Sequence, residues 1–177
     1  MTARADYLNF LERLMGMSDE TWKRHASPWS VYTRMATTPF IVAAIWLHTT
    51  IGYWSITLLT LLVFWIWINP RLFPAPKSTD NWGSKATFGE RVYLNRKKVP
   101  IPKQHRFFPH LLGAISGVGF FVMLWGAWKN FFWPTATGFS LMYLGKLWFL
   151  DRMVWLYEDM KDATPEYRSW LYGEKSS

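Results

Sequence analysis

Two long apolar blocks constrain the fold of this chain more than any other feature. The first runs from Pro28 to Ile68 and contains one charged residue, Arg34. Its most apolar part, residues 38–68, would span roughly 46 Å as one helix, whereas about 20 residues suffice to cross a bilayer. The step Thr49-Thr50-Ile51-Gly52 interrupts this run near its middle, as expected of a turn. We therefore predict a helical hairpin rather than one long helix.

The helix boundaries in this first block follow from capping and proline chemistry. Ser27 precedes Pro28, a pair typical of a helix start, so the first helix is expected from there to about Thr50. The second is expected from Tyr53 to Ile68. It should end before Pro70, because a residue that precedes proline disfavours helical backbone.

The second apolar block repeats this plan. A third helix is expected from Pro109 to Trp128, and a fourth from near Pro134 to about Met160, which is long enough to leave a membrane and continue into water. The predicted fold class is an all-α polytopic membrane protein, with four transmembrane helices arranged as two hairpins. The expected segments are an amphipathic interfacial stretch (1–27), hairpin one (28–68), a basic loop (69–108), hairpin two (109–160) and a tail (161–177).

The N-terminal segment does not resemble a cleaved signal peptide, because it contains several acidic residues and no apolar run of useful length. Apolar side chains recur every three or four residues over 3–16, which predicts an amphipathic helix. This helix could lie on the bilayer surface or pack on the protein's own loop.

The distribution of charge predicts the topology. The central loop carries nine Lys or Arg residues against two acids, Asp80 and Glu90, whereas the two short turns carry only Lys129. The positive-inside rule therefore places the loop and both termini in the cytoplasm, with the protein in the inner membrane. Topology accounts for most of the formal net charge of +8, so nucleic acid is not an expected partner.

Small residues on the third helix predict close helix packing. Gly113, Ser116, Gly117 and Gly119 include one GxxxG spacing, and the fourth helix offers Gly138 and Gly145. In lipid, small side chains let two backbones approach closely. Packing of the third helix on the fourth is the expected use of these residues, and a homodimer seam is the alternative.

Lys146 is the most unusual residue of the second block, because it lies within the apolar stretch SLMYLGKLWFL. An ionisable residue in a membrane segment suggests a functional site. The simpler interpretation is a lysine that snorkels to the interface or forms a structural ion pair. A role in ligand binding or proton movement is the alternative.

Other candidates lie near the same predicted interface. Asp151, Glu158 and Asp162 share one helical face, where they could pair with Arg91, Arg96 and Lys97 of the loop or, alternatively, form a carboxylate cluster for a metal ion or a general base. A short interfacial helix is expected over 84–96, with Phe88, Val92 and Tyr93 towards lipid. The ligand or ion-pair candidates are Lys146, Asp151, Arg152, Asp80, Asn81 and His110. The headgroup-binding candidates are Lys85, Arg91, Arg96, Lys97 and Lys98.

Several kinds of chemistry find no support in the sequence. The chain has no Cys, which excludes disulfides, thiolate metal sites and Cys nucleophiles. It has no Walker lysine motif and no GxSxG elbow. His25, His105 and His110 could meet at the inner interface, but their spacing matches no metal motif. No metal site is predicted, no cofactor can be named, and enzymatic activity stays open, with the balance against it.

The motifs NPRLFP, STDNWGSKATFGERVYLNRKKVPIP and LGKLWFLDRMVWLYEDMKDA resemble a family of small bacterial integral-membrane proteins that is identified only as a domain of unknown function. The resemblance covers roughly residues 24–163. It implies a membrane protein and supplies no substrate, cofactor or catalytic residue.

These observations lead to three functional hypotheses. The first is a non-catalytic accessory or assembly subunit of a larger membrane complex, because no catalytic motif is assembled and aromatic surfaces are abundant. The second is a membrane enzyme or a binder of a lipid or isoprenoid-type molecule at the cytoplasmic interface. The third is a small transporter or channel. Other membrane subunits and anionic lipids are the expected partners, and a homo-oligomer is possible.

Overall fold

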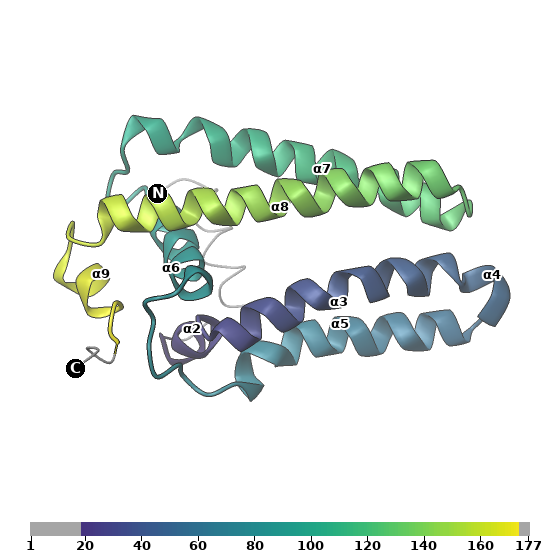
Figure 1. Cartoon of the computed structure of the whole chain (residues 1–177), viewed down its shortest axis with the longest axis horizontal. Coiled ribbons are helices and arrows are strands. Elements are labelled where there is room, and N and C mark those ends of the chain that lie inside the picture. The colour runs from purple at the N-terminus through teal and green to yellow at the C-terminus, as the bar shows by residue number, and fades with distance from the viewer. Residues whose placement is uncertain (1–18, 174–177) are drawn as a thin grey trace.

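The computed structural model describes residues 19–173, and every regular element in that range is a helix (Figure 1). The amphipathic helix expected over 3–16 lies outside these residues. Two helical stretches, Trp54–Leu72 and Lys103–Trp128, are long and apolar enough to cross a membrane. The all-helical prediction is thus confirmed for the described part of the chain.

The first hairpin consists of α3 (Pro28–Trp46) and α5 (Trp54–Leu72), which lie side by side and are joined through the short α4 (His48–Ile51). Its turn falls where the Thr-Thr-Ile-Gly step predicted it, and Gly52 there has a φ of 54°, which glycine adopts without strain. The end of each hairpin at which a short turn joins its two helices is called the turn end. The opposite end, where the central loop lies, is called the loop end.

One predicted boundary in this hairpin is wrong, because α5 continues through Pro70 to Leu72. The reason is a polar contact between the two helices. Buried Asn69 accepts a hydrogen bond from the Ser30 hydroxyl (2.8 Å) and donates one to the Thr33 hydroxyl (2.9 Å). These bonds hold the residue before the proline in the helix, and they outweigh its local preference for extended backbone.

The second hairpin consists of α7 (Phe107–Trp128) and α8 (Phe132–Met160), which pack along much of their length (Figure 1). Glycines allow their backbones to touch. A Cβ atom at Gly119 would overlap the backbone of Met142, and one at Gly126 would lie 2.6 Å from the Thr135 nitrogen. The expected packing of the third helix on the fourth is therefore confirmed.

Helix α6 (Trp82–Leu94) forms most of the layer that closes the loop end. Asn81 caps it by accepting a hydrogen bond from the Ser84 backbone N–H at 2.9 Å. The helix packs against the loop-end half of α8, where Gly89 touches the Met153 backbone. Shorter helices complete this layer: α2 (Asp19–His25), the 3₁₀ turn η1 (Lys103–His105) and α9 (Pro165–Ser169).

The expectation that Phe88 and Val92 face lipid is wrong. Both are buried in the core that joins α6 to α8, together with Met153, Leu156 and Tyr157. The physical reason is that one apolar helix face serves equally well against lipid or against protein. Because Gly89 has no side chain, α6 comes close enough to α8 for this face to pack against protein rather than lipid.

Candidate functional site

Four helices each contribute one titratable side chain to a cluster at the loop end, between the two hairpins. We call His25 (α2), Arg34 (α3), Glu90 (α6) and Lys146 (α8) the ionic cluster. Lys146 Nζ lies 2.8 Å from Glu90 Oε1, and Arg34 Nη1 lies 3.1 Å from His25 Nε2. The ion pair expected for Lys146 therefore exists, and its partner is Glu90 of the central loop.

Local contacts position the two cations of this cluster. Arg34 Nε donates to the Ser30 carbonyl at 3.0 Å, one helical turn earlier. The Lys146 ammonium lies 4.7 Å from the ring centroid of Phe149, a favourable cation–π arrangement. Lys146 still leaves 53% of its side chain exposed, so it remains accessible to a ligand.

The tautomer of His25 follows from its neighbour. A guanidinium only donates hydrogen bonds, so His25 Nε2 must accept from Arg34 and the ring proton must be on Nδ1. Burial, reinforced by the positive charge of Arg34, lowers the pKa of His25 to about 3. The ring is therefore neutral near pH 7. Its Nδ1–H donor is buried and has no hydrogen-bond partner within residues 19–173, which leaves room for an acceptor from outside this part of the chain.

Glu90 remains charged despite its surroundings. Burial on its own would raise the pKa of this carboxyl group, but the charge and hydrogen bond of Lys146, helped by the charge of Arg34, hold it below the usual value. With neutral His25, two cations and one anion leave the ionic cluster with one excess positive charge. Such a charge, where it is partly buried, favours an anionic group beside it.

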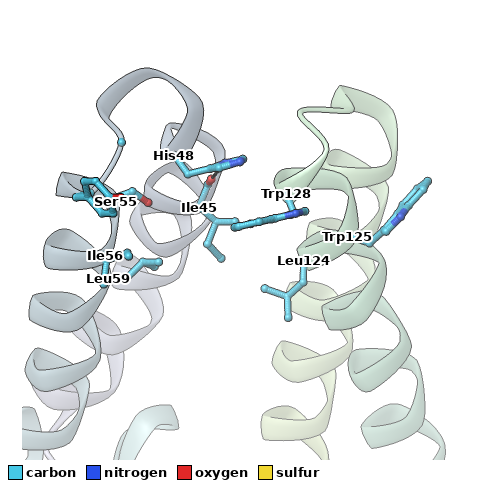
Figure 2. Close-up of a pocket in the computed structure, with 10 residues that line it drawn as sticks. Ile45, His48, Ser55, Ile56, Leu59, Leu124, Trp125 and Trp128 are labelled. Atoms are coloured by element: carbon cyan, nitrogen blue, oxygen red, sulfur yellow. Dashed lines mark hydrogen bonds between the residues drawn. The ribbon is translucent and has the colours of Figure 1, made fainter.

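Two apolar pockets lie between the hairpins towards the turn end. Figure 2 shows the larger, of about 640 Å³. Residues of α3, α4 and α5 line one side of it and residues of α7 line the other, among them Ile45, His48, Ile56, Leu124 and Trp128. The second, of about 530 Å³, lies between α3 and α8, from Pro39 and Phe139 to Trp46 and Phe132.

The hairpins touch each other beside these pockets. The His48 ring stacks on Trp128 with centroids 4.4 Å apart (Figure 2), and Asn130 Nδ2 donates to the Trp46 carbonyl at 2.7 Å. We call these two apolar pockets together the inter-hairpin chamber. The ionic cluster lies nearer the loop end than either pocket.

Two glycines on α7 lie on the helix face that meets the first hairpin. His110, Gly113, Gly117, Leu124 and Trp128 recur at spacings that place them on one helical face. Leu124 and Trp128 of this face meet the first hairpin at the larger pocket, and His110 contacts Tyr93 of α6. Between these contacts, a Cβ atom at Gly113 or Gly117 would meet nothing within 4 Å. The GxxxG glycines therefore face open space, while other glycines make the contact with α8.

A family model described as a family of unknown function, DUF6653, matches residues 9–171. The chain belongs to the DUF6653 family. No match was found among curated proteins or solved structures. The resemblance expected from the loop and helix motifs is confirmed as far as a family of unknown function, while its bacterial origin remains a prediction.

The structure of this DUF6653 chain divides the predicted ligand candidates among several places. Lys146 belongs to the ionic cluster. Asp80 pairs with Lys85 at 2.6 Å, and Asn81 caps α6. Arg152 lies 3.4 Å from its neighbour Asp151, and His110 lies 3.2 Å from the Tyr93 hydroxyl.

Several of the basic residues proposed for headgroups also have partners within the DUF6653 chain. Lys85 bridges Asp80 and Glu158, at 2.6 and 2.7 Å. Arg91 lies 3.4 Å from Glu166, and Arg96 lies over the Tyr93 ring at 4.1 Å. Lys97 and Lys98 are exposed. The acidic face of α8 thus meets the loop, but the loop partner of Glu158 is Lys85 rather than Arg91 or Arg96, and Asp162 pairs with Arg168 of α9.

The three histidines expected near the inner interface do not converge. His25 contacts Arg34, His105 lies 2.7 Å from Asp159, and His110 contacts Tyr93. In the described part of this chain, no group of three or more His, Cys, Asp or Glu side chains lies close enough together to hold a metal ion.

Sequence reasoning missed three members of the ionic cluster. Arg34 was visible as the only charge of the first apolar block, and Glu90 as one of two acids in a basic loop. Charges isolated in unfavourable surroundings tend to pair, so joining these two anomalies with Lys146 was the signal available. His25 had no comparable signal.

Proposed function

We propose that this protein is a non-catalytic membrane-embedded binding protein, which holds an anionic amphiphile between its two hairpins. The anionic group would lie at the ionic cluster and the hydrocarbon part in the chamber below it. This is the second of the hypotheses raised by the sequence, restricted to binding. The observation that carries it is one excess positive charge placed over an apolar chamber.

The membrane arrangement proposed with it has four spans, with the loop end and both termini in the cytoplasm of a bacterium. Helices α3 and α5 have 19 residues each, or about 28 Å at 1.5 Å per residue, close to the thickness of a bilayer core. Each of the two strongly apolar stretches has one partner helix along it, α3 for α5 and α8 for α7. Aromatic residues at both ends and basic residues in the loop support this orientation.

The dimensions of the chamber fit one leaflet of lipid. From Arg34 to Trp46, α3 rises by about 18 Å, somewhat more than half of a bilayer core of about 30 Å. A hydrocarbon chain that starts at the ionic cluster would therefore reach both apolar pockets. Three groups would face its anionic end: the Arg34 guanidinium, the Lys146 ammonium and, where its orientation allows, the His25 Nδ1–H donor. Charge-assisted hydrogen bonds of this kind are strong in surroundings that exclude water.

Native mass spectrometry of the protein, gently extracted from its own membrane, tests this proposal. We expect one anionic amphiphile per chain in the wild type and its loss in Lys146→Met. Lys98→Met, at an exposed residue of the loop, should retain it and serves as the control. A chain that carries only neutral lipids, or equal occupancy in the two variants, would contradict the proposal. Larger subunits that remain bound to the chain in place of a small molecule would support the accessory role instead.

A further inference from the structure

A third pocket, of about 390 Å³, lies at the loop end of the second hairpin and outside the inter-hairpin chamber. The η1 turn and the first turn of α7 form one side of it, and α8 forms the other. Its lining includes Gln104, His105, Phe108, Arg152, Trp155 and Asp159. None of them belongs to the ionic cluster or lines either apolar pocket.

One side of this pocket presents a carboxylate that is held in place. Asp159 Oδ2 accepts hydrogen bonds from His105 Nε2 at 2.7 Å and from Gln104 Nε2 at 3.1 Å. Both bonds go to the same oxygen, and within residues 19–173 no donor is paired with Oδ1. A carboxylate oxygen can accept more than one hydrogen bond, so Asp159 has capacity for a further donor.

The opposite charge in the pocket is a poorly paired guanidinium. Arg152 Nη2 lies 3.4 Å from Asp151 Oδ2, which is long for a charge-assisted bond. Its Nε is buried and has no hydrogen-bond partner in the described residues. Its Cζ lies 5.7 Å from the Trp155 ring centroid. A guanidinium offers five N–H donors, so Arg152 can still bind an anion.

From this arrangement we propose that the pocket binds the headgroup of a zwitterionic phospholipid that carries a primary amine, as in phosphatidylethanolamine. The lipid phosphate would accept from Arg152 and the ammonium would donate to Asp159. The Phe108 and Trp155 rings would contact the glycerol and upper acyl region, where aromatic side chains are common at membrane interfaces. The inference rests on the membrane orientation proposed above, but on none of the residues of the chamber.

Native mass spectrometry with added lipids tests the inference. Delipidated protein is mixed with phosphatidylethanolamine or phosphatidylglycerol of the same acyl chains, at equal concentrations. Wild-type protein should retain the ethanolamine lipid about tenfold better, the effect of one charge-assisted hydrogen bond. Arg152→Gln should lower its retention by about tenfold or more, because the phosphate loses its partner. Asp159→Asn should reverse the preference, because the amine loses its partner while the cation stays.

The control for this test is Arg168→Gln, which removes an exposed cation paired with Asp162 and should bind lipid like the wild type. Lys146→Met should also retain this lipid, which separates the present inference from the proposed function. Thermal unfolding verifies that each variant is folded, and if Asp159→Asn is not, Arg152→Gln and the wild-type preference decide. No preference between the two lipids in the wild type, or equal retention in Arg152→Gln and Arg168→Gln, would overturn the inference.

Discussion

At the scale of single residues, His25 links the ionic cluster to pH. Its ordinary pKa of 6.5 falls to about 3 on burial beside Arg34. Between these two values the unfolded chain binds a proton that the folded chain does not, so the free energy of unfolding decreases as the pH falls. The lowered pKa of Glu90 acts in the same direction below its ordinary value of 4.5.

We therefore expect the wild type to lose roughly 2 kcal/mol of stability between pH 7.5 and 5 through His25. His25→Gln keeps an acceptor for Arg34 but has no proton to gain, so its stability should change less over this range. Thermal or denaturant unfolding in detergent at several pH values measures the difference. Parallel pH profiles for the two proteins would contradict a buried neutral histidine.

At the scale of helices, backbone contact at glycine positions decides how the layers pack. Gly89 of α6 lies against the Met153 backbone, where a side chain has no room, whereas Gly113 of α7 faces open space. Substitution by alanine at these two positions should therefore affect stability differently.

Gly89→Ala should destabilise the protein by about 1–3 kcal/mol, since α6 must move away from α8. Gly113→Ala should be neutral or stabilising by up to about 1 kcal/mol, because alanine favours helix and meets no neighbour. Unfolding midpoints of both variants in the same detergent measure this. If Gly113→Ala were as damaging as Gly89→Ala, the face of α7 assigned to the chamber would be packed against another element.

The helices and the packing of α7 on α8 are largely predictable from the sequence, whereas the contacts that the central loop makes with the hairpins are not. Local chemistry determines the hairpins. It consists of the length of the apolar blocks, the Thr-Thr-Ile-Gly step and the glycines of the second block. By contrast, Lys146 and Glu90 are separated by 56 positions, and no local period links them. The burial of Phe88 was missed because its helix face suits lipid and protein equally. The end of α5 is predicted too early, before Pro70, because the hydrogen bonds that keep Asn69 helical come from α3.

At the scale of the whole molecule, α6 and the ionic cluster connect the two hairpins at the loop end, and the His48–Trp128 stack connects them at the turn end (Figure 1). This arrangement suits a membrane, where lipid-like molecules can enter between helices from the side. The proposed orientation places the loop end, which carries most of the basic residues, in the cytoplasm.

Single cysteines can test this orientation directly, because the chain contains no Cys. Lys129→Cys marks the turn end and Lys98→Cys marks the central loop. In spheroplasts we expect a membrane-impermeant maleimide to label the first variant at once and the second only after permeabilisation. The reverse pattern would invert the topology, and labelling of both in intact spheroplasts would argue against four spans.

The central claim is that the charge of the ionic cluster selects an anionic ligand. With neutral His25, the cluster has a formal charge of +1 in the wild type, +2 in Glu90→Gln, 0 in Lys146→Met, and +1 in the double variant that carries both changes. The measurement is the affinity of the delipidated proteins for the amphiphile recovered from the wild type, by titration in detergent. Each variant is first checked for folding, because Lys146→Met leaves Glu90 without its partner.

We expect affinity to follow charge: Glu90→Gln strongest, the wild type and the double variant similar, and Lys146→Met at least about tenfold weaker, as for the loss of one charge-assisted contact. The double variant is the decisive member, since it lacks Lys146 yet keeps the net charge through Arg34. Equal affinities across the four folded proteins would contradict the claim.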